Sequence, residues 1–151
     1  MGLDWETFSY GEVNINVNGM SKQPDWALGP RRPPPGTRKR PMVVAEIAIS
    51  ETRTRLQRDI DLWLDPSRGN TNVAIAIKIN RTRLLITIDN IEIRESHIGD
   101  EVRVSGAPLT IPFDLLFLRP PKSPREGDLT IGKEGIEEFA KWVWEAQFAP
   151  F

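Results

Sequence analysis

The fold of this chain is decided by residues 42–50, which read Met42-Val43-Val44-Ala45-Glu46-Ile47-Ala48-Ile49-Ser50. The run is apolar except for Glu46, and continuous apolar sequence of this length is typical of a central strand covered on both faces. A carboxylate in a strand interior costs free energy unless it is paired or binds a ligand. Glu46 is therefore the first candidate for a functional residue.

A second acidic residue lies upstream, in a run of strand character at residues 22–28. Asp25 follows Pro24 there, and the run is expected to be the hairpin partner of an alternating strand over residues 12–18, with Asn18-Gly19 as the turn. Two carboxylates on consecutive strands suggest a metal site. The alternative for each acid is an ordinary half-exposed strand position in water.

The chain after residue 50 is expected to contain a helix, further strands and a terminal helix. Ser50 is a favourable N-cap, and apolar residues recur at helical spacing before Asp65-Pro66, so residues 51–65 are expected to form an amphipathic helix. Further elements are expected to be strands at 73–79, 84–94, 102–104 and 129–131 and a helix at 133–148. We therefore expect a single α/β (α+β) domain over residues 1–151, with Pro-rich loops at 29–41 and 107–127.

The loop at 29–41 is the most basic stretch of the chain. Its prolines remove hydrogen-bond donors and fix φ, so neither a strand nor a helix is expected there. The basic residues are Arg31, Arg32, Arg38, Lys39 and Arg40. Such a concentration suits the phosphate backbone of DNA or RNA. A solvated loop, a loop docked on an acidic patch and a nuclear-import signal are the alternatives.

Composition excludes several classes of function. The 20 basic and 21 acidic residues leave a net charge of -1, so any attraction to nucleic acid must be local. The absence of cysteine excludes disulfides, thiolate metal sites and cysteine nucleophiles. No apolar run approaches the ~20 residues of a membrane helix, and no signal peptide is recognisable. We expect an intracellular protein, cytoplasmic or nuclear, without a membrane partner. The single histidine, His97, lies in a polar turn and excludes multi-histidine zinc sites.

Taken in order, these motifs resemble the P-D-(D/E)-X-K nuclease superfamily. The resemblance rests on Pro24-Asp25, on Glu46-Ile47-Ala48 and on the helix that follows directly. Residues 43–51, 62–64 and 111–121 look most like uncharacterised restriction-endonuclease-like proteins of filamentous fungi, and the chain is similar also to a related family of cyanobacteria. The resemblance spans approximately residues 11–145.

The resemblance implies a restriction-endonuclease-like mixed central sheet flanked by helices, and a metal-dependent nuclease. A Mg²⁺ or Mn²⁺ ion would be held by Asp25, Glu46 and the carbonyl of Ile47, because hard cations prefer oxygen ligands. Such an ion polarises the scissile phosphate of DNA or RNA and lowers the pKa of the attacking water.

The sequence departs from the family motif at one position. Ala48 stands where the motif has a lysine, and a methyl group cannot carry charge. Lys78 is the preferred substitute, because Ala74 and Ala76 on its strand face leave room for a long side chain. The alternatives are helix arginines, Arg55 and Arg58, and a Lys78 that merely extends to solvent.

Glu12 is a candidate accessory acid. The alternative is an ordinary solvent-facing acid in an alternating strand.

The second interpretation of the whole chain is a catalytically inactive nuclease fold that binds protein or nucleic acid or forms homo-oligomers. Aromatic residues near the C-terminus suit such an interface, or the packing of the last helix on the sheet: Trp142, Trp144, Phe148 and Phe151.

Overall fold

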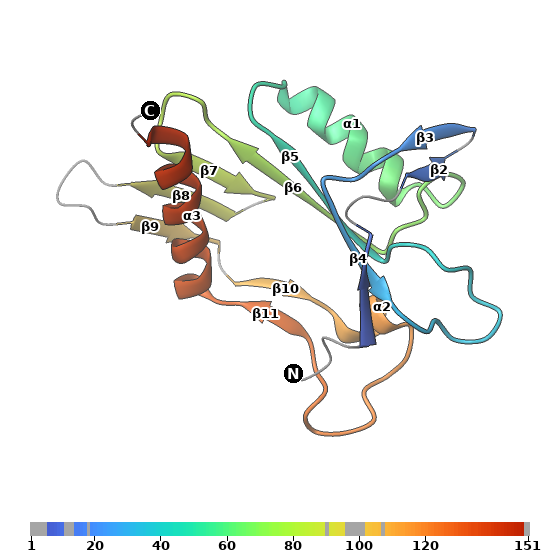
Figure 1. The fold of residues 1–151 in the computed structure, drawn as a ribbon. Coiled ribbons are helices and arrows are strands. Elements are labelled where there is room, and N and C mark those ends of the chain that lie inside the picture. The colour runs from blue at the N-terminus through green and yellow to red at the C-terminus, as the bar shows by residue number, and fades with distance from the viewer. Residues whose placement is uncertain are drawn as a thin grey trace.

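The computed structural model describes residues 6–10, 14–17, 19–89, 91–95, 102–106 and 108–149. Its main sheet consists of β1 (Thr7–Ser9), β4 (Trp26–Pro30), β5 (Val43–Ala48), β6 (Val73–Ile79), β7 (Leu85–Ile88), β8 (Ile91–Glu95) and β9 (Val102–Ser105). These strands lie in the order β1-β4-β5-β6-β7-β8-β9, with β5 and β6 parallel and the other neighbours antiparallel. The fold is thus mixed α+β, with helices on both faces of the sheet (Figure 1).

The parallel pair is connected by helix α1 (Arg53–Leu64), which packs against β5 and β6. It corresponds to the helix predicted at 51–65, and it ends before Asp65-Pro66 as expected. The N-cap is Thr52 and not Ser50, since the Thr52 hydroxyl accepts a hydrogen bond of 3.3 Å from the Arg55 N–H. The helix buries Leu56, Ile60 and Trp63, which recur at the spacing of one helical face.

Alternate residues of β5 serve two different cores. Val43 and Ala45 belong to the larger core, which α2 (Phe113–Phe117) and α3 (Lys133–Phe148) cover. Val44 belongs with Trp63 to the smaller core under α1. Because strand side chains alternate between faces, Glu46 and Ala48 lie on the α1 side of the sheet. No described helix is both long and apolar enough to cross a membrane.

The N-terminal strand pairing differs from the prediction. Within the described residues, β2 (Ile15–Val17) pairs with the short β3 (Met20–Lys22) alone, and residues 26–30 join the main sheet between β1 and β5. The hairpin of β2 and β3 contains three residue pairs. Pro24 offers no N–H and the chain bends at Asp25, so the next strand starts afresh.

The expected boundary of the basic loop was also wrong. Gly29 and Pro30 are the last residues of β4 and pair with Phe8 and Thr7. Proline is tolerated at such a strand end, because its missing N–H interrupts few ladder hydrogen bonds. The stretch expected as a strand at 84–94 forms two strands, since Asp89, with a φ of 49°, lies between β7 and β8. A separate two-stranded sheet pairs β10 (Leu109–Ile111) with β11 (Leu129–Ile131) antiparallel.

The turn after α1 gives a test of this packing. Gly69 donates a 3.1 Å hydrogen bond to the Leu62 carbonyl, and a Cβ placed on Gly69 would lie 2.6 Å from both the Cα and the carbonyl oxygen of Trp63. Gly69→Ala should therefore lower the free energy of unfolding by about 1–3 kcal/mol, measured by urea denaturation. Gly127→Ala is the control, because nothing lies within 4 Å of its added Cβ. Equal stability of the two variants would contradict the tight contact at Trp63.

Candidate functional site

Glu46 is buried in the middle of β5, with 7% of its surface exposed. The indole N–H of Trp63 donates a hydrogen bond to its Oε1 atom, and the ammonium of Lys22 lies 3.4 Å from the same oxygen. These contacts explain how the strand tolerates a buried carboxylate, since a donor and a positive charge replace water.

Lys22, at the end of β3, connects the small hairpin to the site. Its Nζ atom lies 2.9 Å from Asp59 Oδ1 on α1 and 5.8 Å from the centre of the Trp63 ring. One ammonium therefore compensates two carboxylates. Lys22 and Asp59 were not found from the sequence, because their partners lie on separate elements and no spacing along the chain relates them. For Trp63 one signal existed, since a buried indole N–H needs an acceptor.

Asp25 does not lie inside a strand, contrary to the prediction. It occupies an exposed bend just before β4, and its Oδ2 atom accepts a hydrogen bond of 2.6 Å from the Ile47 N–H. Trp26 pairs with Ala45, so one further step of this antiparallel register sets Asp25 opposite Glu46. The sheet thus brings together the two acids that the motif pairs.

The two acids interact electrostatically. Burial raises the pKa of the Glu46 carboxyl, the Trp63 hydrogen bond and the Lys22 charge oppose this, and the charges of Asp25 and Asp59 raise it again, so that the pKa ends above its ordinary value. Burial alone would lower the pKa of Lys22, but its hydrogen bond to Asp59 and the charges of Glu46 and Asp59 raise it. Glu46, Asp25 and Asp59 are thus three carboxylates whose charges act on one another, and Lys22 pairs with two of them, Glu46 and Asp59.

Lys78 lies next to the motif position that Ala48 leaves without a charge. The parallel register pairs Ala48 with Lys78, and both residues are on the α1 side of the sheet. The Lys78 ammonium donates to the carbonyl oxygen of Glu51, just beyond β5. Lys78 also lines a pocket of about 460 Å³ between α1 and the sheet, together with Arg53, Leu56, Gln57, Ile60, Ala76, Thr87 and Asp89. The strand position is suitable, although the ammonium is directed toward the Glu51 carbonyl.

The other predicted site residues are more dispersed. Arg55 and Arg58 are exposed on α1, and Arg55 forms an ion pair of 3.4 Å with Glu51. Glu12 and His97 lie outside the described residues, as does Phe151. Of the C-terminal aromatic residues, Trp144 belongs to the larger core, while Trp142 is 64% exposed and Phe148 is 48% exposed.

The basic loop lies away from the two acids. It leaves β4 at Pro30, the end opposite to Asp25, and leads to the start of β5. Part of it is fixed, because Arg40 Nε donates a 2.6 Å hydrogen bond to the Asn70 carbonyl and the Lys39 ammonium lies 4.6 Å from the Phe8 ring centre. Arg31, Arg32 and Arg38 are exposed.

The donor set fits a hard divalent cation with few protein ligands. Within the described part of the chain, no group of three or more His, Cys, Asp or Glu side chains could hold a metal ion. Mg²⁺ commonly uses one or two carboxylates and keeps several waters. Asp25, Glu46 and the Ile47 carbonyl are oxygen donors of this kind, and the two hydrogen bonds above use Oδ2 of Asp25 and Oε1 of Glu46, not the second oxygen of either carboxylate.

Known proteins do not add to this assignment: no family model, no curated protein and no solved structure matches the chain.

Replacing Lys22 tests the charge balance around Glu46. Lys22→Met removes the cation that lowers the Glu46 pKa, while the charges of Asp25 and Asp59 remain, so the pKa should rise above its value in the wild type. The measurement is a ¹³C NMR titration of glutamate side-chain carboxyls, with Glu46→Gln used to assign the resonance. Lys141→Met, on the exposed side of α3, should leave the titration unchanged. An unchanged Glu46 pKa in Lys22→Met would mean that the ion pair does not form.

Proposed function

We propose that the chain is a divergent P-D-(D/E)-X-K-type domain with a restriction-endonuclease-like fold, which hydrolyses phosphodiester bonds of DNA or RNA with Mg²⁺ or Mn²⁺. The observation that carries the proposal is the register of three neighbouring strands. It sets Asp25 opposite Glu46, and it sets Lys78 beside Ala48. Two acids and a basic residue, one acid in the bend before β4 and the other two residues on the adjacent strands β5 and β6, are the groups that this chemistry requires.

Each residue has a distinct role in this proposal. Asp25, Glu46 and the carbonyl of Ile47 would hold the metal ion, which supplies Lewis-acid activation of the phosphate and of a water molecule. Trp63 fixes the Glu46 carboxylate through its N–H, and the Ile47 N–H fixes Asp25. Lys78 would stabilise negative charge on the phosphate, after exchanging its bond to the Glu51 carbonyl for the substrate.

A second candidate is favoured by Lys22. Its ammonium contacts both Glu46 and Asp59, and so compensates the buried carboxylate without a metal ion. In a catalytically inactive domain the acids would remain as part of a stabilising ion-pair network, and the chain would bind protein or nucleic acid or form homo-oligomers. The exposed Trp142 and Phe148 are suited to such contacts.

Metal binding distinguishes the two candidates without a substrate. If Mn²⁺ binds the folded protein, a concentration ten times the Kd adds about 1.4 kcal/mol of stability, which raises the Tm by roughly 3–6 °C for a domain of this size. Thermal unfolding with and without millimolar MnCl₂ or MgCl₂ should show this rise in the wild type and not in Glu46→Gln. Glu138→Gln, on the exposed side of α3, should keep it. No shift in the wild type would contradict the metal site.

Cleavage is tested with labelled single- and double-stranded DNA and RNA in the presence of Mn²⁺. Asp25→Asn and Glu46→Gln should abolish the activity, because each removes a metal ligand. Lys78→Met should reduce it by about 10²–10³-fold if this residue stabilises transition-state charge. Activity that survives in Asp25→Asn would identify a contaminating nuclease. A wild type that binds metal but cleaves none of the four substrates would favour the binding domain.

A further inference from the structure

A second pocket lies near the end of β4 that is opposite to Asp25. Its volume is about 600 Å³, and its lining comes from two segments that are distant in the sequence. Residues 30–35 contribute prolines together with Arg31 and Arg32, and residues 117–122 contribute Phe117, Arg119 and Lys122. Glu6, next to β1, completes the lining. The basic loop is therefore one wall of a pocket.

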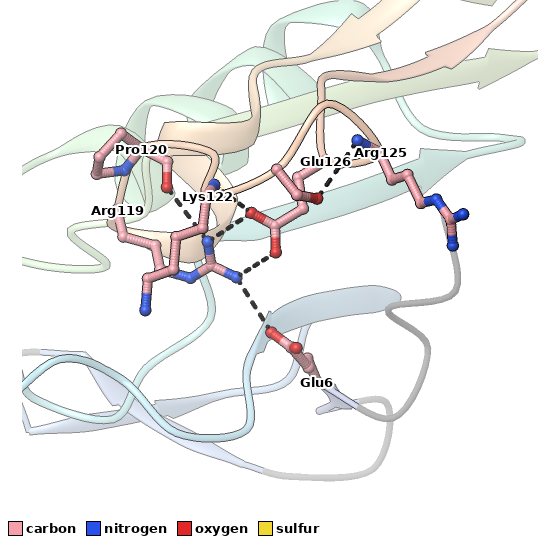
Figure 2. Close-up of polar contacts among 7 residues, drawn as sticks. Glu6, Arg119, Pro120, Lys122, Arg125 and Glu126 are labelled. Carbon is pink, nitrogen blue, oxygen red and sulfur yellow. Dashed lines mark hydrogen bonds and ion pairs between the residues drawn. The ribbon is translucent and has the colours of Figure 1, made fainter.

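Arg119 holds this pocket together through a compact ion-pair cluster (Figure 2). Its guanidinium donates two hydrogen bonds to Glu126, of 2.9 and 3.0 Å, and a third of 3.3 Å to Glu6. The N–H of Lys122 donates a further hydrogen bond of 2.6 Å to Glu126. The Arg119 hydrogen bonds and this backbone hydrogen bond lower the pKa of Glu126 to about 2. Glu126 therefore remains charged near neutral pH, and both carboxylates accept hydrogen bonds from Arg119.

The remaining cations of the pocket face outward. Arg31, Arg32 and Lys122 are exposed, and in Figure 2 the Lys122 ammonium points away from the Glu126 carboxylate. The pocket and its ion-pair cluster contain four positive and two negative side chains, a local excess of two positive charges. The cations are Arg31, Arg32, Arg119 and Lys122, and the anions are Glu6 and Glu126. The whole chain has a net charge of -1, so this excess is a local feature of the pocket. Such a pocket attracts a polyanion.

We propose that this pocket binds the phosphodiester backbone of a nucleic-acid strand, with Arg31, Arg32 and Lys122 contacting phosphates and Arg119 fixing the pocket wall. Three features favour nucleic acid over an acidic peptide. Arginine side chains match phosphate oxygens with paired donors. Prolines 33–35 form a stiff wall that loses little entropy on binding. The proline rings offer apolar faces for sugars or bases.

The inference rests on the proposed function for the identity of the ligand and adds the position of the strand. From Asp25 to Pro30 the chain advances five residues in an extended conformation, or about 16 Å. Measured along β4, the pocket and the acid pair are therefore about 16 Å apart.

Binding is measured by fluorescence anisotropy of labelled single-stranded DNA and RNA in EDTA, so that neither metal binding nor cleavage contributes. The wild-type affinity should fall with salt concentration. The triple variant Arg31→Ser, Arg32→Ser, Lys122→Ser should bind about 10–100-fold more weakly near 0.1 M salt, with a slope of log K against log salt reduced by about 2, because each phosphate contact on a single strand contributes about 0.7. The matched control, Arg83→Ser, Arg103→Ser, Lys141→Ser, removes the same charge from exposed positions elsewhere and should bind like the wild type.

Each other outcome has a definite meaning. An unchanged slope in the pocket variant, an equal loss in the matched control, or no binding by the wild type would overturn the proposal. Equal competition by polyglutamate and by unlabelled oligonucleotide would also overturn it, since the pocket would then accept any polyanion. Glu138→Gln, on the exposed side of α3, should bind oligonucleotide normally in EDTA. If the wild type binds oligonucleotide as expected but shows neither metal binding nor cleavage, the nuclease proposal is refuted and the proposal of a nucleic-acid-binding pocket is retained.

Discussion

The buried carboxylate of Glu46 is the constraint on which the α1 side of the sheet depends. Water does not solvate a carboxylate that is buried in a central strand, so groups on other elements must compensate its charge. The helix supplies the Trp63 N–H, and the small hairpin supplies the Lys22 ammonium. Asp59 then holds Lys22 from the helix. The same interactions that make Glu46 tolerable thus fix the hairpin, the helix and the sheet against one another.

The parallel pairing of β5 and β6 determines where this group can act. A parallel neighbour requires a crossover, and α1 provides it by covering one face of both strands. The two faces of the sheet therefore differ in the side chains that they carry. On the other face Val43 and Ala45 join an apolar core with α2 and α3, while on the α1 face Glu46 and Lys78 are accommodated beside small residues such as Ala48 and Ala76. A charged site is compatible with a stable domain because the larger core is kept free of it.

The elements with a strong period could be predicted from the sequence. β5 is a continuous apolar run, and Leu56, Ile60 and Trp63 recur at helical spacing. Such patterns lie within one short segment, so they predict a buried strand and a helix without knowledge of the rest of the fold. The strand pairing of residues 22–30 was less predictable, because it depends on partner strands elsewhere in the chain. Lys22 and Arg119 illustrate the limit. Each is identified as an organising residue only by carboxylates from separate segments, and no spacing rule relates them.

The positions of the charges connect the two proposals. Around Glu46 the carboxylates of Asp25 and Asp59 add negative charge that Lys22 offsets only in part, so in the proposed nuclease a phosphate chain would need a divalent cation to approach them. At the other end Arg31, Arg32 and Lys122 extend outward, and the acids nearby are already bound to Arg119. Affinity and chemistry would then come from opposite ends of one strand. The basic pocket would retain the polyanion, and a divalent cation at the acid pair would turn repulsion into coordination. Lys22 would then oppose that second step, because a metal ion at Glu46 would compete with an ammonium that already contacts this carboxylate.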